Sequence, residues 1–451
     1  MNGSRFHAAV VGAGPAGLAA ALRLRAAGAH VTVFDSAPGP GGRACTHGVD
    51  GFRVDPAVQL VSASYANFAR VLRACGADGL LQRSPGRDAL WRKGRAHEVV
   101  YGSPASMLAS GALPLALKLR MGAQYLPYLQ RYAGSLDLSA LERAAAAGLD
   151  GESIADWGGR ELGRDFVDLL AAPLLATLYG CAPAEASAGF YHALAREGMS
   201  LEVQALHGGM GGLGRAAADR LASRGAVLRF GTPVLGVDAG ESGAVVRTAA
   251  GDEAFGAVVV AVPAPAALEI AKFLTPPAAK ALAAVRVRPA ATLALLLDRP
   301  VGVRWFGLSY AGGESRGAAA ACVQENKVGG LVPPGKGLVT VFALPAAAER
   351  LLGADVDAAV RMLVPDVARA LPGIERHVER AELYTWRDGW TLFGPGALGR
   401  LPALRAAAWE SSPRAVLAGD YLYAPTVEGA VTAGLDAADL LVERFPEMGG
   451  A

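Results

Sequence analysis

The sequence has little cysteine and no long apolar run. Its 451 residues include only four cysteines, and these stand far apart, at Cys45, Cys75, Cys181 and Cys322. No two have the close spacing of a zinc or iron–sulfur site, and four cannot make a dense disulfide framework. We therefore expect free thiols in a reducing compartment, which favours the cytoplasm. No stretch of about 18 uninterrupted apolar residues occurs, so no membrane-spanning helix is expected.

The sequence also lacks a charge excess and a clustered set of histidines. Its 43 basic and 41 acidic side chains give a net charge of +2, which excludes the strong field typical of nucleic-acid binding. The seven histidines show no metal-ligand spacing, and no nucleophile-elbow motif of the GxSxG type occurs. The length of 451 residues suggests roughly two to three domains, and with 52% hydrophobic residues the chain can bury sizeable cores.

Glycine, by contrast, is abundant and begins an ordered pattern. An apolar strand is predicted at 7–11, followed at once by the glycine-rich segment 12–17. A helix is predicted over 18–27 and a second apolar strand over 30–34. This strand–turn–helix–strand order is the context in which a GxGxxG segment binds a dinucleotide.

Each glycine of this segment has its own physical role. Gly12 permits the tight turn, Gly14 lets the backbone approach a pyrophosphate, and Gly17 lets the helix lie close to the strand. The N-terminus of the following helix offers free N–H groups, which attract phosphate. Asp35 lies 21 residues after Gly14, close to the spacing expected for an acid that binds ribose hydroxyls.

The segment after the second strand indicates which dinucleotide binds. Pro38–Arg43 reads PGPGGR. FAD is longer than NAD and must be held in an extended form past that strand end. Gly41 and Gly42 allow backbone contact, and the forked Arg43 side chain can meet phosphate charge. We therefore predict FAD, bound non-covalently, because no cysteine lies between Val323 and the end of the sequence.

Three segments together resemble a known superfamily. VVGAGPAGLAAALRLRAAGAHVTVFDSAPGPGGRA resembles the opening of the flavin amine oxidase, protoporphyrinogen oxidase and phytoene desaturase superfamily. His207–Leu213 resembles its mid-chain GGM segment, and Val416–Leu441 resembles its C-terminal flavin motif. The resemblance covers nearly the whole chain and implies an FAD-dependent oxidase or dehydrogenase. The residues expected to contact FAD are Gly12, Gly14, Pro15, Ala16, Gly17, Asp35, Gly41, Gly42, Arg43, Gln59, Val234, Gly419, Asp420, Glu428, Gly429 and Ala430.

The resemblance implies an α/β (α+β overall) architecture with a discontinuous layout. A Rossmann-like FAD-binding domain is expected from 1–75, 205–275 and 401–445. A mixed-sheet substrate-binding domain is expected from 76–100 and 276–400, and a helical subdomain from 101–204. Trp386 and Tyr384 are candidates for lining the substrate cavity.

Two features of amine oxidases in this superfamily are missing. A lysine usually stands on a strand of the substrate domain near the flavin, but the matching strand 287–297 has none. An aromatic usually precedes the EGA segment, where this chain has Thr426. We therefore predict hydride removal from carbon in a bulky, largely apolar substrate, with oxygen or another electron acceptor. Protoporphyrinogen oxidase-like and desaturase-like chemistry both fit; the alternatives are an amine oxidase without the usual lysine, a redox-neutral isomerase and a structural FAD binder.

Partners beyond the substrate are less constrained. The segment 103–132 carries Leu, Met, Tyr and Pro, with Lys118, Arg120 and Arg131 as its only charges. Such a basic amphipathic helix can rest on a membrane surface, although a helical cover over the active site is the interpretation we favour. Peripheral membrane contact and a homodimer therefore both stay open.

Overall fold

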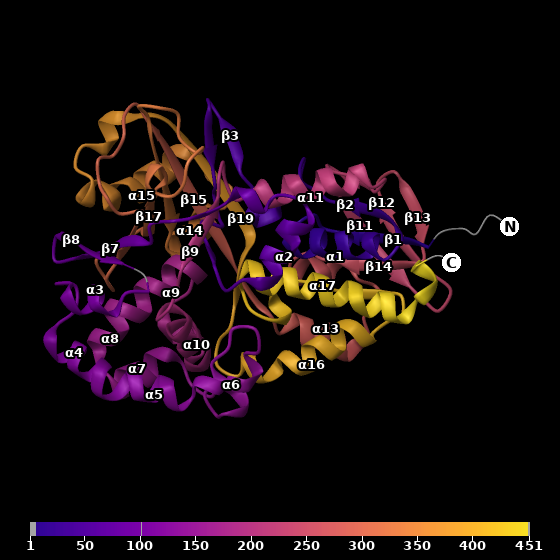
Figure 1. Ribbon diagram of the computed structural model, residues 1–451, viewed down its shortest axis with the longest axis horizontal. Helices are drawn as coiled ribbons and strands as arrows, with labels where there is room; N and C mark the ends of the chain where they lie inside the picture. Colours follow the sequence, from indigo (N-terminus) through magenta and orange to yellow (C-terminus); the bar gives the residue numbers. More distant parts are fainter. Residues whose placement is uncertain (1–5, 101, 450–451) are drawn as a thin grey trace.

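The computed structural model describes residues 6–100 and 102–449. Figure 1 shows a parallel sheet with its helices on the right, a second sheet on the upper left and a group of helices on the lower left. Each of these three regions has its own buried cluster of apolar side chains.

The parallel sheet has five strands, and separate stretches of the chain supply them. Its order is β10-β2-β1-β14-β20, and every neighbouring pair is parallel. The strands are β1 (His7–Val11), β2 (His30–Phe34), β10 (Val227–Arg229), β14 (Ala257–Val260) and β20 (Ala415–Leu417). Because parallel strands share one carboxyl edge, the turn after β1 and the turn after β20 meet at that edge.

Helices and a small sheet cover the parallel sheet. Helices α1 (Pro15–Ala26) and α17 (Val427–Arg444) approach so closely that a Cβ atom at Gly434 would lie 2.0 Å from the Ala16 carbonyl oxygen. An antiparallel sheet contributes to the same apolar core. The other covering elements are α11 (Gly212–Ser223), β11 (Val234–Ala239), β12 (Ala244–Thr248), β13 (Gly251–Phe255), α12 (Ala264–Ile270), α13 (Pro276–Ala283) and α16 (Ala397–Glu410).

The second sheet has seven strands in the order β19-β15-β18-β17-β16-β7-β8. All pairs are antiparallel except β16 with β7. Helices α14 (Pro345–Leu351) and α15 (Val356–Ala370) bury one of its faces. The strands are β7 (Arg87–Arg92), β8 (Arg95–Val100), β15 (Arg286–Leu297), β16 (Gly307–Tyr310), β17 (Ala318–Val323), β18 (Gly337–Ala343) and β19 (Val378–Leu392).

The helical region lies below this sheet (Figure 1). Its core holds many aromatic rings, and the rings of Trp157 and His192 meet at 4.3 Å between centroids. The elements are α3 (Pro104–Ala109), α4 (Leu115–Arg120), η3 (Met121–Tyr125), α5 (Leu126–Arg131), α6 (Glu142–Ala146), α7 (Ile154–Glu161), α8 (Arg164–Phe166), η5 (Val167–Ala171), α9 (Ala172–Tyr179) and α10 (Ala188–Gly198). Turns of π-helix at η3 and η5 continue the helices around them.

Short elements connect the three regions. They are the hairpin β3 (His47–Val49) and β4 (Phe52–Val54), the three-stranded sheet β5 (Val61–Ser62), β9 (Val203–Leu206) and β6 (Leu81–Arg83), and helix α2 (Ala66–Ala74). No helix in the described part of the chain is both long enough and apolar enough to cross a bilayer.

The fold class expected from the sequence is confirmed. The first helix starts at Pro15, three residues earlier than expected, because proline fits the first helical position, where its missing N–H costs nothing. Strand β15 begins at Arg286, one residue before the strand expected at 287–297. All four cysteines are free thiols, and Cys181 and Cys322 are buried.

Candidate active site

The turn after β1 leaves no room for side chains at two of its glycines. Gly12 has a φ of 104°, and a Cβ atom there would lie 2.5 Å from the Ala261 carbonyl oxygen. A Cβ atom on Gly17 would lie 1.8 Å from the Gly12 carbonyl oxygen. A Cβ atom on Gly14 would meet no atom within 4 Å. Backbone is therefore open to a ligand at Gly14, beside the uncapped N-terminus of α1.

Asp35 fastens the end of β2 to this turn. Its Oδ2 accepts a hydrogen bond from the Ala13 N–H at 2.6 Å, and its Oδ1 accepts one from the Ala37 N–H at 2.7 Å. A carboxylate has further lone pairs, so ribose hydroxyls can still bind. The Thr232 N–H donates to the Asp35 carbonyl oxygen at 2.8 Å, which brings the segment that leads to Val234 beside this acid.

Arg43 and Asp420 join the first and last segments of the site. Arg43 Nη2 lies 3.1 Å from Asp420 Oδ2, and Thr391 Oγ1 donates to Asp420 Oδ1 at 3.1 Å. Asp420 is only 7% exposed, so its carboxylate is largely shielded from solvent. A Cβ atom on Gly42 would lie 3.1 Å from the Gly14 Cα atom, so the two glycine turns face each other.

The N-terminus of α17 points its free N–H groups at the same edge. Thr426 caps the helix, and its Oγ1 accepts the Gly429 N–H at 3.0 Å. A Cβ atom on Gly429 would lie 2.2 Å from the Ala424 carbonyl oxygen, so only glycine fits this turn. Thr426 thus caps a helix at the position where the sequence resemblance implied an aromatic in amine oxidases.

Two of the predicted contacts have side chains occupied elsewhere. Glu428 accepts the backbone N–H groups of Asn67 and Phe68, both at 2.8 Å, and so caps helix α2. Burial raises the pKa of the Glu428 carboxyl, although those two donors oppose the rise. Gln59 Oε1 accepts from Gln324 Nε2 at 2.9 Å and from Lys327 Nζ at 3.2 Å. Contacts of Glu428 and Gln59 with FAD would therefore come from their backbone.

A buried ion pair, which no sequence pattern indicated, lies beside these loops. Lys327 Nζ donates to Asp55 Oδ2 at 2.7 Å, and both side chains are fully buried. Asp55 also accepts from Thr46 Oγ1 at 2.5 Å and from the Met210 N–H at 3.0 Å. The pair therefore connects the segment after Arg43, the GGM segment and the loop after β17. Lys327 stands in an ordinary loop, and only the tertiary fold reveals its partner.

The seven-stranded sheet presents an apolar face to this edge. Strand register places Thr292, Phe342 and Ala320 in one row across β15, β18 and β17. Phe342 and Cys322 form a buried cluster with Phe306, against which Leu60 packs. Leu60 follows Gln59, so this face, which we call the roof, adjoins the cofactor loops. Burial raises the pKa of the Cys322 thiol, which keeps it neutral.

The two aromatic candidates lie on β19, at one side of the roof. The ring of Tyr384 lies 4.9 Å from the His47 ring and packs against the β3–β4 hairpin. Trp386 pairs with Ala290, and the following three residues bulge out of the sheet. At the end of this bulge, the Gly389 carbonyl accepts a hydrogen bond from Arg43 at 3.0 Å. Cavity-lining roles for Tyr384 and Trp386 stay predictions.

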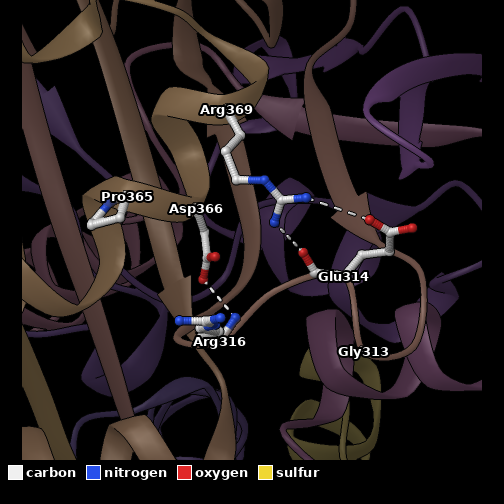
Figure 2. Close-up of a pocket in the computed structure, with 6 residues that line it drawn as sticks. All are labelled: Gly313, Glu314, Arg316, Pro365, Asp366 and Arg369. Atoms are coloured by element: carbon white, nitrogen blue, oxygen red, sulfur yellow. Dashed lines mark hydrogen bonds and ion pairs between the residues drawn. The ribbon is translucent and has the colours of Figure 1, made fainter.

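A depression on the surface lies away from these residues. Its volume is about 420 Å³, and Figure 2 shows its lining on α15 and the β16–β17 loop. Asp366 accepts the N–H groups of residues 316 to 318, and Arg369 donates to the Glu314 carbonyl. These charges hold the loop to α15, on the face of the sheet opposite the roof, so the depression is not a candidate for the active site.

Comparison with known proteins decides the family. The model for flavin containing amine oxidoreductases matches residues 15–442. The chain belongs to this family. It is therefore an FAD-dependent oxidoreductase, and the open backbone at Gly14, the facing glycine turns and the N-terminus of α17 fit FAD. Non-covalent binding is typical of the family.

Individual relatives carry different activities. A phytoene dehydrogenase from Streptomyces griseus is 31% identical over 255 residues, which are 52% of this chain and 49% of that protein. The match thus spans about half the length of the curated relative. A protein from Exiguobacterium described as a protoporphyrinogen oxidase has 16% identity, a TM-score of 0.76 and coverage of 97% and 98% of the two chains. Cyclohexylamine oxidase from Brevibacterium oxydans has 18% identity, a TM-score of 0.76 and coverage of 98% of this chain and 100% of that chain.

Proposed function

We propose that this enzyme removes a hydride from a carbon atom of a bulky, largely apolar substrate. The observation that supports this most is the roof, whose row of Thr292, Phe342 and Ala320 carries no ionisable group. Such a surface orients an apolar molecule and excludes water, and burial keeps its Cys322 thiol neutral, so the thiol is a poor base for an ammonium group. Bound FAD supplies the hydride acceptor.

The chain's own residues would hold the cofactor in three places. The turn at Gly12–Gly17 and the α1 N-terminus would bind the pyrophosphate, with Asp35 on the ribose. Arg43 and Asp420 would hold the middle of the molecule. The capped N-terminus of α17 would direct N–H groups at the ring and stabilise the negative charge that builds up on it. These roles remain proposals, as do the domain boundaries expected from the sequence.

The absence of a lysine from β15 counts against amine oxidation. The strand reads RVRPAATLALLL, and the one buried lysine that adjoins the cofactor loops is Lys327, which is already paired with Asp55. Lys327 therefore already has a structural partner. Reduced tetrapyrroles and polyenes are the two substrate classes that fit the roof and the named relatives. Oxygen or another acceptor would reoxidise the enzyme.

An anaerobic reduction experiment tests the proposal. The purified holoenzyme is mixed without oxygen with protoporphyrinogen, with phytoene in detergent or with a panel of primary and secondary amines, and the flavin absorbance is followed. We expect bleaching by one of the two apolar compounds and return of the colour in air or with a quinone. Bleaching by amines alone would show amine oxidation instead. A flavin spectrum that no compound changes, with turnover of none of them, would favour the redox-neutral alternatives.

A further inference from the structure

The outer side of one helix in the helical region is apolar. The elements α4, η3 and α5 form one continuous helical run from Leu115 to Arg131. Leu115 is 72% exposed, Leu119 is 64% exposed and Leu126 is 37% exposed. Leu115 and Leu119, four residues apart, lie on one side of α4, and Leu126 follows the π-helical turn η3. The opposite side is also apolar and is buried in the core of the helical region, through Leu117, Tyr125 and Leu129.

The neighbouring helix α3 extends this surface. Leu108 is 59% exposed, and the exposed residues near it, at positions 105, 109 and 111, are alanine or glycine. Lys118 Nζ donates to the carbonyl oxygens of Leu108 at 2.5 Å and Ser110 at 2.8 Å, which fixes the end of α3 to α4. We call the four exposed leucines at 108, 115, 119 and 126 the apolar platform.

The platform is unusual within this molecule. Nine large hydrophobic side chains are exposed among the described residues, and four of them belong to the platform. Helices α3, α4 and α5 lie along the outer edge of the helical region, far from the parallel sheet (Figure 1). Nearby α7 shows the ordinary pattern, because its outer side carries Arg160, paired with Glu152 and Glu161. A helix that faces water normally has such a charged side, so the platform requires an apolar or interfacial environment.

The charge around the platform indicates what covers it. No acidic residue occurs between Glu98 and Asp137, whereas Lys118, Arg120 and Arg131 lie within that interval. Protein interfaces are enriched in tyrosine, tryptophan and arginine, but every large exposed apolar side chain here is leucine. Aliphatic side chains on helices that carry basic and no acidic residues complement a lipid surface with anionic headgroups. The acidic Glu161, on the adjacent α7, is paired with Arg160.

We propose that the apolar platform rests on an anionic lipid membrane, with its leucines at the boundary of the acyl chains and the basic side chains near the phosphates. The structure thus favours the membrane contact that the sequence left as the weaker of two interpretations. Binding to lipid does not depend on the proposed reaction. It would, however, bring the enzyme to the phase in which an apolar substrate dissolves.

Vesicle flotation tests the proposal with the holoenzyme. Wild-type protein, L115S/L119S and the control L235S/L352S are mixed with vesicles of phosphatidylcholine alone or with added phosphatidylserine. Leu235 and Leu352 are 61% and 37% exposed but lie outside the platform. We expect the wild type and the control to float with the phosphatidylserine vesicles. The L115S/L119S variant should bind at least about tenfold more weakly, and salt should weaken binding of the wild type.

Folding and self-association are checked on the same samples. The flavin spectrum and the thermal unfolding midpoint show whether L115S/L119S is folded, and both should match the wild type because the two leucines are exposed. Wild type that floats with neither vesicle, or a folded L115S/L119S variant that floats as well as the wild type, overturns the proposal. A wild-type dimer in solution that becomes a monomer in L115S/L119S would assign the platform to a second copy of the chain instead. Anaerobic reduction in detergent reports on the proposed function separately.

Discussion

The two sides of the candidate active site differ in polarity: the cofactor side is polar and the roof side is apolar. On the cofactor side, Arg43, Thr391 and Asp420 are joined by an ion pair and a hydrogen bond, and two glycine turns open the backbone. On the roof side, Phe342 and Cys322 are buried among other apolar residues. A charged, flexible cofactor needs many directed contacts, whereas an apolar substrate needs a shape from which water is excluded. The comparison implies that substitutions on the cofactor side abolish folding or FAD binding, whereas substitutions on the roof side change the activity toward the substrate.

The largest effect is expected from Gly17→Ala. The new Cβ atom would lie 1.8 Å from the Gly12 carbonyl oxygen, so β1 and α1 could not pack as they do. We expect no folded, yellow protein, measured by soluble yield and FAD content. Gly39→Ala is the control, because a Cβ atom there meets nothing within 4 Å. A folded, FAD-loaded Gly17→Ala protein would contradict the close approach.

The second effect concerns the ion pair at the junction between the two sides. Lys327→Met leaves the fully buried Asp55 without its cation, which should lower the free energy of unfolding by about 3–5 kcal/mol. Asp55→Asn combined with Lys327→Met should cost less than the two single changes added together, because neither charge is then left alone. Denaturant unfolding of all four proteins measures this coupling. Strictly additive losses would show that the two groups do not stabilise each other.

The third effect separates cofactor binding from folding. Gly14→Val adds a side chain where the apoprotein has open space, so the fold should persist. The valine would occupy the place where a pyrophosphate approaches the backbone, and FAD affinity should fall by roughly 100-fold. Fluorescence titration of the apoprotein with FAD measures the affinity, and thermal unfolding without FAD serves as the control. Unchanged affinity would place the pyrophosphate elsewhere.

The fourth effect tests the roof. Phe342→Leu changes the shape of the face that adjoins the cofactor loops, so kcat/KM for the substrate that bleaches the flavin should fall by about tenfold, with FAD content unchanged. Val341→Ala is the matched control, since this buried side chain lies on the opposite face of the same strand, against α14 and α15. It should reduce stability and keep kcat/KM within about twofold. A fall in kcat/KM in Val341→Ala but not in Phe342→Leu would indicate that the substrate binds on the other face of the sheet.

The smallest effect lies in the helical region. Burial lowers the pKa of His192 to about 3, so the folded protein holds the neutral ring. Below about pH 6.5 the unfolded chain takes up a proton that the folded one refuses, and stability falls by about 1.4 kcal/mol per pH unit as the pH drops toward 3. His192→Phe should remove this dependence, so that between pH 6.5 and 5.5 the variant loses about 1 kcal/mol less stability than the wild type. Urea unfolding at several pH values measures the slope, and identical slopes would mean that His192 binds protons equally in the folded and unfolded states.

The sequence predicted local structure well and long-range partners poorly. The turn at Gly12–Gly17, the acid Asp35 and the Gly-Asp turn before α17 depend on neighbouring residues, and their spacing carries the information. The side chains of Glu428 and Gln59 act on segments hundreds of residues away, on α2 and on Lys327. No periodicity records such contacts. Thr426 shows the same limit, because its role as a helix cap was visible only when α17 was seen to begin at Val427.

The interleaved order of the parallel sheet has a consequence for biosynthesis. Strand β20 is an edge strand that pairs with β14, and α17 packs directly on α1, so the first and last segments of the sheet are neighbours. A ribosome makes β1 and the glycine turn about 400 residues before it makes β20. Throughout that interval the nascent chain exposes an unpaired strand edge and the apolar side of α1. From this order we expect that the nascent chain needs chaperone protection and that the cofactor binds only after release.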